Sequence, residues 1–206
     1  MELLQKLIDF GGIAIIRCGD QESGQRTADA IIAAGMTSIE ITLTTPGALK
    51  IIENLAARPE LRVGVGTVLS TKDVADAASA GAQFIISPHT DIEIIKATKN
   101  KGLLSLPGVV TPSEVATALS AGADVLKFFP ALAVGPAYLK ALTEPFPNNL
   151  WCPTGGMSVA TIPDWFAAGA SMVGIGGPLT AGGFEAIAKN VSDFIAAINK
   201  AKGTKV

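Results

Sequence analysis

Three charged residues lie within or at the end of short apolar runs, where they could act on a carbonyl compound. Lys127 lies within VLKFFPA, Glu40 within SIEITL, and Arg17 ends the run GIAIIR. A neutral lysine amine in a dry pocket attacks a carbonyl carbon and forms an imine that accepts electrons. A neighbouring carboxyl group can move the protons that this reaction requires. These residue types therefore predict the cleavage of a carbon–carbon bond through a covalent lysine intermediate.

Energetics favour this functional interpretation of the lysine over a structural one. Burying an ion costs several kcal/mol, and aliphatic side chains would stabilise a core better. Loss of solvation and the cation of Arg17 would favour a neutral amine on Lys127, whereas ionised Glu40 would favour the ammonium. Two structural alternatives remain open at this point. Lys127 could extend from a strand end to water, and Arg17 could pair with Asp20.

A regular alternation of strands and helices must position these side chains. Apolar runs short enough to be strands end at residues 17, 43, 68, 88, 108, 130, 156 and 177. Segments with helical spacing lie between them, at 27–34, 71–80, 112–121 and 162–168, several of them opened by a capping residue. The pattern predicts one α/β domain over residues 1–206, a (β/α)8 TIM barrel. A doubly wound open sheet is the alternative, but the first strand is not followed by GxGxxG.

In such a barrel the chemistry lies at the carboxyl ends of the strands, and alternate residues point inward. Lys127 then faces the interior together with Val125 and Phe129. Glu40 enters the same interior, with Ser38 and Thr42 on its face of the strand. The following residues also stand at strand ends: Arg17, Thr67, Ser87 and Pro88. The sequence therefore predicts that a lysine, a glutamate and an arginine meet at one mouth.

Two glycine pairs follow the last two predicted strands. Gly155–Gly156 ends WCPTGG, and Gly176–Gly177 ends VGIGG. Glycine lets backbone N–H groups approach an anion closely, and the loops after strands seven and eight are the usual phosphate site of this barrel. We therefore expect both pairs to bind a substrate phosphate. Thr154, directly before the first pair, is a further substrate-binding candidate.

Composition limits the partners to small molecules. The net charge of -2 and the pI near 5.4 argue against nucleic acid and against an anionic membrane surface. No run of about 18 apolar residues is free of charge, so a cytoplasmic protein without a membrane segment is expected. One histidine, His89, and two separated cysteines, Cys18 and Cys152, make a catalytic metal poorly supported. We therefore predict no metal and no cofactor.

The order of short motifs resembles one enzyme family over residues 13–177. The motifs are IR, EITLTTP, VGVGTV, FIISPH, LPGVVTPSE, LKFFPA and CPTGG. They are similar to those of the 2-dehydro-3-deoxy-6-phosphogluconate aldolases, a family that includes the 6-phosphogalactonate and 4-hydroxy-2-oxoglutarate aldolases. The resemblance implies a metal-independent class I aldolase of the Entner–Doudoroff type. It also implies a homotrimeric (β/α)8 lyase that releases pyruvate and glyceraldehyde 3-phosphate.

The same resemblance implies roles for individual residues. Lys127 matches the Schiff-base lysine and Glu40 the general acid/base. The remaining matches are Arg17 and Thr67 at the pyruvate end, Pro88 and Phe129 as pocket walls, and Gly155, Gly156 and Gly176 in the phosphate loops.

Two positions depart from the family pattern and leave the substrate open. Thr44 stands where many members have arginine, and Pro178 where they have serine. The alternative substrates are therefore 4-hydroxy-2-oxoglutarate or another 2-oxo acid without phosphate. A sugar-phosphate isomerase or epimerase, and a silent sugar-phosphate binder, are alternatives of a different kind.

Overall fold

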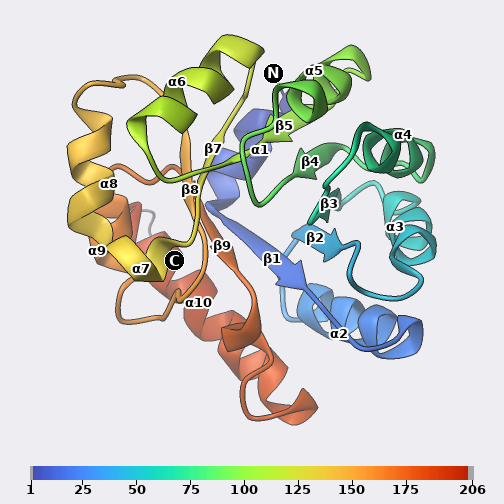
Figure 1. Cartoon of the computed structure of the whole chain (residues 1–206). Helices are drawn as coiled ribbons and strands as arrows, with labels where there is room; N and C mark the ends of the chain where they lie inside the picture. The colour runs from blue at the N-terminus through green and yellow to red at the C-terminus, as the bar shows by residue number, and fades with distance from the viewer. Residues whose placement is uncertain (1, 204–206) are drawn as a thin grey trace.

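The computed structural model describes residues 2–203, and strands in it alternate with helices along the chain (Figure 1). The strands are β1 Gly12–Ile16, β2 Ser38–Thr42, β3 Arg62–Gly66, β4 Phe84–Ile86, β5 Leu104–Leu106, β6 Gly108–Val109, β7 Leu126–Phe128, β8 Trp151–Pro153 and β9 Val173–Ile175. The α-helices are α1 Glu2–Phe10, α2 Gln21–Ala33, α3 Ala48–Ala56, α4 Thr71–Ser79, α5 Ile92–Asn100, α6 Pro112–Ala121, α7 Ala131–Val134, α8 Pro136–Thr143, α9 Ile162–Ala167 and α10 Ile187–Ala201. Two short 3₁₀ turns, η1 Gly177–Leu179 and η2 Phe184–Ala186, follow β9.

All strand pairs are parallel, and their hydrogen-bonded ladders form two curled sheets. The six-stranded sheet has the order β5-β4-β3-β2-β1-β9, and the three-stranded sheet has the order β6-β7-β8. Neighbours in space are thus neighbours in sequence, apart from β9, which pairs with the first strand. This order differs from that of a doubly wound sheet, in which the strand order reverses near the middle. The α/β class with a curled parallel sheet is confirmed.

Pro107 marks the division between the two sheets. The sequence predicts one strand that ends at Gly108, but the structure has two segments, β5 and β6, on either side of this proline. Proline has no backbone N–H and so interrupts a ladder of hydrogen bonds. β5 pairs with β4, and β6 pairs with β7. The expected eight strands therefore appear as nine segments.

Local signals fix where the helices begin. The side chain of Asp20 accepts a hydrogen bond from Ser23 N, so α2 begins at Gln21, six residues before the predicted start. Thr111 and Glu114 form a capping box at the start of α6. The four predicted helices are confirmed; α6 has the predicted bounds, and the other three differ at one or both ends.

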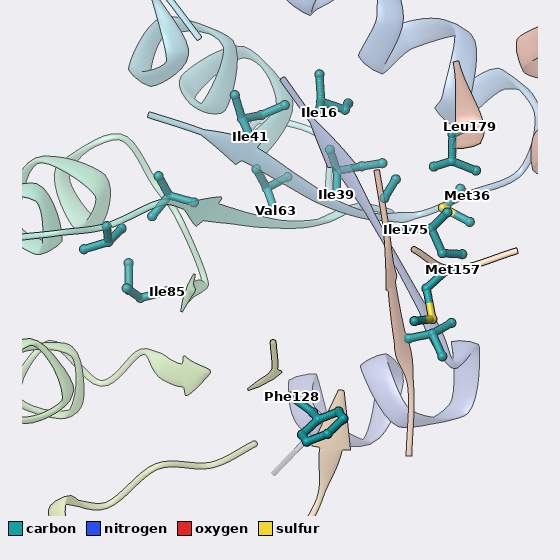
Figure 2. Close-up of a cluster of buried hydrophobic side chains, with 14 of the residues drawn as sticks. Ile16, Met36, Ile39, Ile41, Val63, Ile85, Phe128, Met157, Ile175 and Leu179 are labelled. Atoms are coloured by element: carbon teal, nitrogen blue, oxygen red, sulfur yellow. The ribbon is translucent and has the colours of Figure 1, made fainter. Parts of the chain in front are cut away.

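Two apolar clusters lie on the two faces of the curled sheets. The larger cluster fills the layer between strands and outer helices and includes Ile39 and Ile41 of β2 and Phe128 of β7 (Figure 2). The smaller one lies on the interior face; its members are Leu7, Ile13, Phe84, Ile86, Leu106, Val125, Cys152 and Met172. The predicted alternation is confirmed, because Val125 is interior whereas Phe128 packs under helices. The buried charged residues of the described chain, Glu40 and Lys127, come from β2 and β7.

Candidate active site

Glu40 is buried in the interior, and glycines in β3 make room for it. Its side chain is 1% exposed. An ideal Cβ on Gly66 would lie 1.6 Å from Glu40 Oε1, so the carboxyl group occupies the space of a missing side chain. Gly64, on the same face, makes room in the same way for the ring of Phe84. The two glycines of VGVG in β3 therefore leave space for side chains of the neighbouring strands β2 and β4.

The carboxyl group of Glu40 is poorly solvated. Burial raises its pKa, while the positive charges of Lys127 and Arg17 oppose that rise. Oε2 has no hydrogen-bond partner among residues 2–203. A buried, unpartnered carboxyl oxygen is costly to keep. It is therefore available to exchange a proton with a bound molecule.

Lys127 enters the same interior from β7. It is 7% exposed, and its Nζ lies 4.9 Å from the centroid of the Phe129 ring. In the parallel ladders it pairs with Gly108 of β6 on one side and with Cys152 of β8 on the other. Among residues 2–203, the ion pairs within 4 Å do not include Lys127. The interpretation of Lys127 as a strand-end residue that extends to water is therefore wrong.

Arg17 and Thr67 meet at the carboxyl ends of β1 and β3. Arg17 Nη2 donates to Thr67 Oγ1 at 3.4 Å. The side chain of Asp20 instead caps α2, so the alternative pairing of Arg17 with Asp20 is not what the structure shows. Thr67 has a φ of 58°, in the left-handed region that threonine rarely adopts. Such strain is frequent where a side chain must point into a site.

Three further predicted residues lie on or beside the segments that pair with Lys127 or follow it. Thr154, 6% exposed, directly follows β8, and its hydroxyl donates to Cys152 O at 3.2 Å. The carbonyl of Pro88 lies against Gly108, where a Cβ would approach it to 2.3 Å. Phe129 is half-buried, and its ring would lie 3.6 Å from a Cβ on Gly155. The predicted pocket walls therefore adjoin Lys127 through the ladder and through ring contact.

The two glycine pairs have different surroundings. Gly176 and Gly177 line a pocket of about 440 Å³ together with Arg17 and Thr180. Gly155 and Gly156 have φ values of 95° and 74° and are not among the residues that line this pocket. A Cβ on Gly156 would lie 2.6 Å from Leu132. The second pair thus shares a pocket with a cation, and the first packs against α7 and Phe129.

Other polar regions lie away from this interior. A pocket of about 980 Å³ at the opposite, amino-terminal ends of the strands is lined by residues such as Lys6, Thr37 and Arg62. This pocket is larger, but we place the candidate active site at the carboxyl ends of the strands, because two charged side chains are buried there. His89 is at the surface, with 45% of its side chain exposed. It directly follows Pro88 and is exposed.

Within residues 2–203, no three His, Cys, Asp or Glu side chains are placed to hold a metal ion. The described helices include none that is long and apolar enough to cross a membrane.

Some residues of the site were missed by sequence reasoning. Gly66 and Gly64 define the space for Glu40 and Phe84, and Thr180 lines the pocket at the second glycine pair. The alternation VGVG signals close packing on one strand face, but only the neighbouring strands show which side chains use the space. Thr180 follows the glycine pair by three residues and carries no recognisable signal.

Fold and site together define a class of protein. A lysine and a glutamate whose charges act on each other are buried in the interior of a parallel α/β fold, and this arrangement suits an enzyme that acts on carbonyl compounds. The family model described as KDPG and KHG aldolase matches residues 5–198. The chain belongs to this aldolase family.

Individual relatives agree with the family model. The chain is 42% identical over 142 residues to a 2-dehydro-3-deoxy-phosphogluconate aldolase of Pseudomonas aeruginosa; the match spans 68% of this chain and 64% of that protein. A solved structure described as native KDPGal superposes with a TM-score of 0.87 at 32% identity, covering 93% of this chain and 96% of the other. A KDPG aldolase from Legionella pneumophila, with pyruvate captured as a covalent carbinolamine, superposes with a TM-score of 0.82 at 31% identity and 98% coverage of each chain.

Proposed function

We propose that this aldolase cleaves 2-dehydro-3-deoxy-6-phosphogluconate, or its galactonate epimer, to pyruvate and glyceraldehyde 3-phosphate through an imine on Lys127. The observation that carries the proposal is the burial of Lys127 and Glu40 in one interior, with charges that act on each other. A relative of the same family has been captured with pyruvate as a carbinolamine, which supports a lysine-bound intermediate.

The reaction divides into addition, cleavage and release. The neutral amine of Lys127 adds to the substrate C2 carbonyl, and the carbinolamine takes a proton from protonated Glu40 and loses water to give the iminium ion and the Glu40 carboxylate. Glu40 accepts the proton of the C4 hydroxyl, the C3–C4 bond breaks, and its electron pair moves into the iminium to give an enamine and the free aldehyde. Protonation of the enamine at C3 and addition of water then release pyruvate and regenerate the amine.

The raised pKa of Glu40 suits this role. A general acid/base works best when its pKa lies near the operating pH, and burial moves a carboxyl group in that direction. Arg17 and Thr67 are proposed to bind the pyruvate end of the substrate. Thr154, Pro88 and Phe129 are proposed to enclose the reacting carbons, and the glycine pairs to bind the phosphate.

Borohydride reduction in the presence of pyruvate tests this mechanism. A stable mass gain on the peptide that contains Lys127 is expected, and Lys127→Ala should lose both the adduct and the cleavage activity. Lys127→Arg is the matched variant, because it keeps the positive charge but cannot form the imine. Failure of the unmodified protein to give an adduct on Lys127 would refute the mechanism. A sugar-phosphate isomerase or a silent binder would give that result.

A substrate without phosphate is the second candidate, and Pro178 favours it. This residue follows Gly177 directly and has no N–H to offer an anion. Comparison of kcat/KM on both phosphorylated epimers and on 4-hydroxy-2-oxoglutarate separates the candidates. Equal values with and without phosphate would remove the anion-binding role of the glycine pairs.

We also propose that the two sheets close into one (β/α)8 barrel. Two observations support closure: Asp124 N, just before β7, donates to Ser105 O of β5 at 3.0 Å, and Thr154 forms a bridge with Gly174 between β8 and β9. Ser171 N also donates to Trp151 O of β8. Slow hydrogen exchange of the Asp124 and Ser171 amides, matching that of β2, would support a continuous barrel. Fast exchange at either amide would contradict it.

A homotrimer in the cytoplasm is proposed as the working form. Large apolar side chains are exposed on α7 and α8; they are Leu132, Val134 and Tyr138. Exposed apolar groups of this kind are typical of an interface. Light scattering would give the mass of three chains, and Leu132→Asp should lower it. Cell fractionation would test the location.

A further inference from the structure

The ladder around Lys127 places one side chain directly beside it. Paired residues of adjacent parallel strands have their side chains on the same face. Lys127 pairs with Gly108 on one side, which has no side chain, and with Cys152 on the other. Of its two ladder partners, only Cys152 can therefore shape the space next to the lysine.

Cys152 is the member of the interior apolar cluster that pairs with Lys127. It is 2% exposed and belongs to the same cluster as Val125 and Leu106. Burial raises the pKa of its thiol to about 12, and both Lys127 and Glu40 are near enough to influence it. Its sulfur lies 3.9 Å from Thr154 Oγ1, and that hydroxyl contacts the Cys152 carbonyl. The thiol is thus an uncharged group between the interior apolar cluster and the polar site.

We propose that Cys152 is a positioning residue for Lys127: its side chain forms the dry floor beside the amine and holds it in the path of the substrate carbonyl. This role rests on the imine mechanism proposed above. Sulfur is weakly hydrated and behaves as a small apolar group. A hydroxyl at this position would attract water, and water beside the amine stabilises the protonated form, which cannot attack a carbonyl.

The other charged groups that act on this interior come from different strands. Glu40 of β2 and Arg17 at the end of β1 are the charges coupled to this interior, while β3 presents Gly66 and β9 presents Gly174 at its inner face. A change at Cys152 leaves both charges in place. The effect of a Cys152 substitution on the pH dependence of imine formation would therefore show whether water enters the space beside Lys127.

The test compares Cys152→Ser and Cys152→Ala with Val125→Ala. Val125 lies two residues before Lys127 in the same interior cluster, so it controls for loss of core volume. For each protein, the yield of borohydride-trapped pyruvate adduct is measured against pH, together with kcat, KM and Tm. Cys152→Ser should move the midpoint of trapping to higher pH and lower kcat at neutral pH about tenfold, a loss expected when the reacting geometry shifts. KM should change less than kcat.

The control gives the opposite pattern. Val125→Ala should lower Tm but keep the pH midpoint of the unmodified protein. Cys152→Ala should lie between the two, because it removes the thiol without adding a polar group. An unchanged midpoint and kcat in both Cys152 variants would overturn the positioning role while the imine mechanism stands. Absence of the adduct in the unmodified protein would overturn both.

Discussion

The carboxyl group of Glu40 lies in the space that a side chain at Gly66 would occupy. A Cβ built on Gly66 would stand 1.6 Å from Oε1, 2.5 Å from Cδ and 2.8 Å from Cγ of Glu40. β2 and β3 pair in register, with Glu40 opposite Gly64 and Thr42 opposite Gly66. The position of the Glu40 carboxyl group is therefore set by the absence of a side chain on the neighbouring strand.

Gly66→Ala should disable the enzyme without unfolding it. The new methyl group would displace the flexible end of Glu40, and a displacement of about 1 Å can cost about 100-fold in rate. We expect kcat/KM to fall by that order, with a small change in Tm. Steady-state kinetics and thermal unfolding of the same preparation measure both. Normal kinetics would show that Glu40 reaches its position by another route.

Gly64→Ala is the matched control on the same strand face. Its Cβ would stand 2.1 Å from the ring of buried Phe84. A rigid ring in a packed core cannot move aside, so overpacking of roughly 1–3 kcal/mol is expected. Stability should fall more than in Gly66→Ala, whereas kcat of the folded fraction should be retained.

Glu40→Gln should stabilise the protein at neutral pH. Burial raises the pKa of Glu40, so the folded state binds its proton more tightly than the unfolded state does. Stability of the unmodified protein is then highest below the ordinary carboxyl pKa of 4.5 and falls as pH rises through the raised value. Glutamine cannot ionise and avoids this loss. Tm of the variant should exceed that of the parent at pH 7.5, and the two should converge near pH 4.

The exposed carboxyl of Glu93 is the control for that experiment. Its side chain is 75% exposed, so Glu93→Gln should leave Tm at pH 7.5 within error. A Glu40→Gln variant that is less stable than the parent at pH 7.5 would contradict the raised pKa. Its kcat should fall at least about 100-fold, since a general base contributes on that scale.

Thr67→Gly should raise the stability of the protein and weaken substrate binding. Glycine removes the cost of a φ of 58°, about 1 kcal/mol, but Arg17 loses its hydroxyl partner. We expect a higher midpoint of urea unfolding and a higher KM. Asn148 is an exposed residue outside the site, and Asn148→Gly relieves its φ of 64°. It should raise stability alone, and a raised KM there would argue against a site-specific role for Thr67.

Asp124 should matter for stability although it is remote from the chemistry. Both of its oxygens lie 2.6 Å from Lys99 Nζ, and one accepts from Ser105 N at 2.8 Å. Asp124→Ala leaves a half-buried ammonium and a backbone N–H without these partners, which costs about 2 kcal/mol. Lys72→Ala removes an exposed ion pair and should cost less than about 0.5 kcal/mol. Urea titration compares the two.

Much of the site was accessible from sequence because it depends on local patterns. The period of two in SIEITL and VLKFF placed Glu40 and Lys127 on the faces opposite Ile39 and Phe128, and the structure has this arrangement. Capping residues such as Thr111 mark helix starts that the structure confirms. These features follow from interactions within about one turn or one strand, so the residues themselves carry them.

The rest depends on contacts between segments far apart in the chain. The interruption at Pro107, the fit of Glu40 against Gly66, and the pairing of Lys127 with Cys152 all require the register between strands. The same is true of the pocket that joins Gly177 to Arg17. The sequence by itself determined which residues have side chains that can react with or bind a substrate, and on which face of a strand they lie. Only the tertiary structure decided which of them meet, because register and curvature are set by the packing of all strands together.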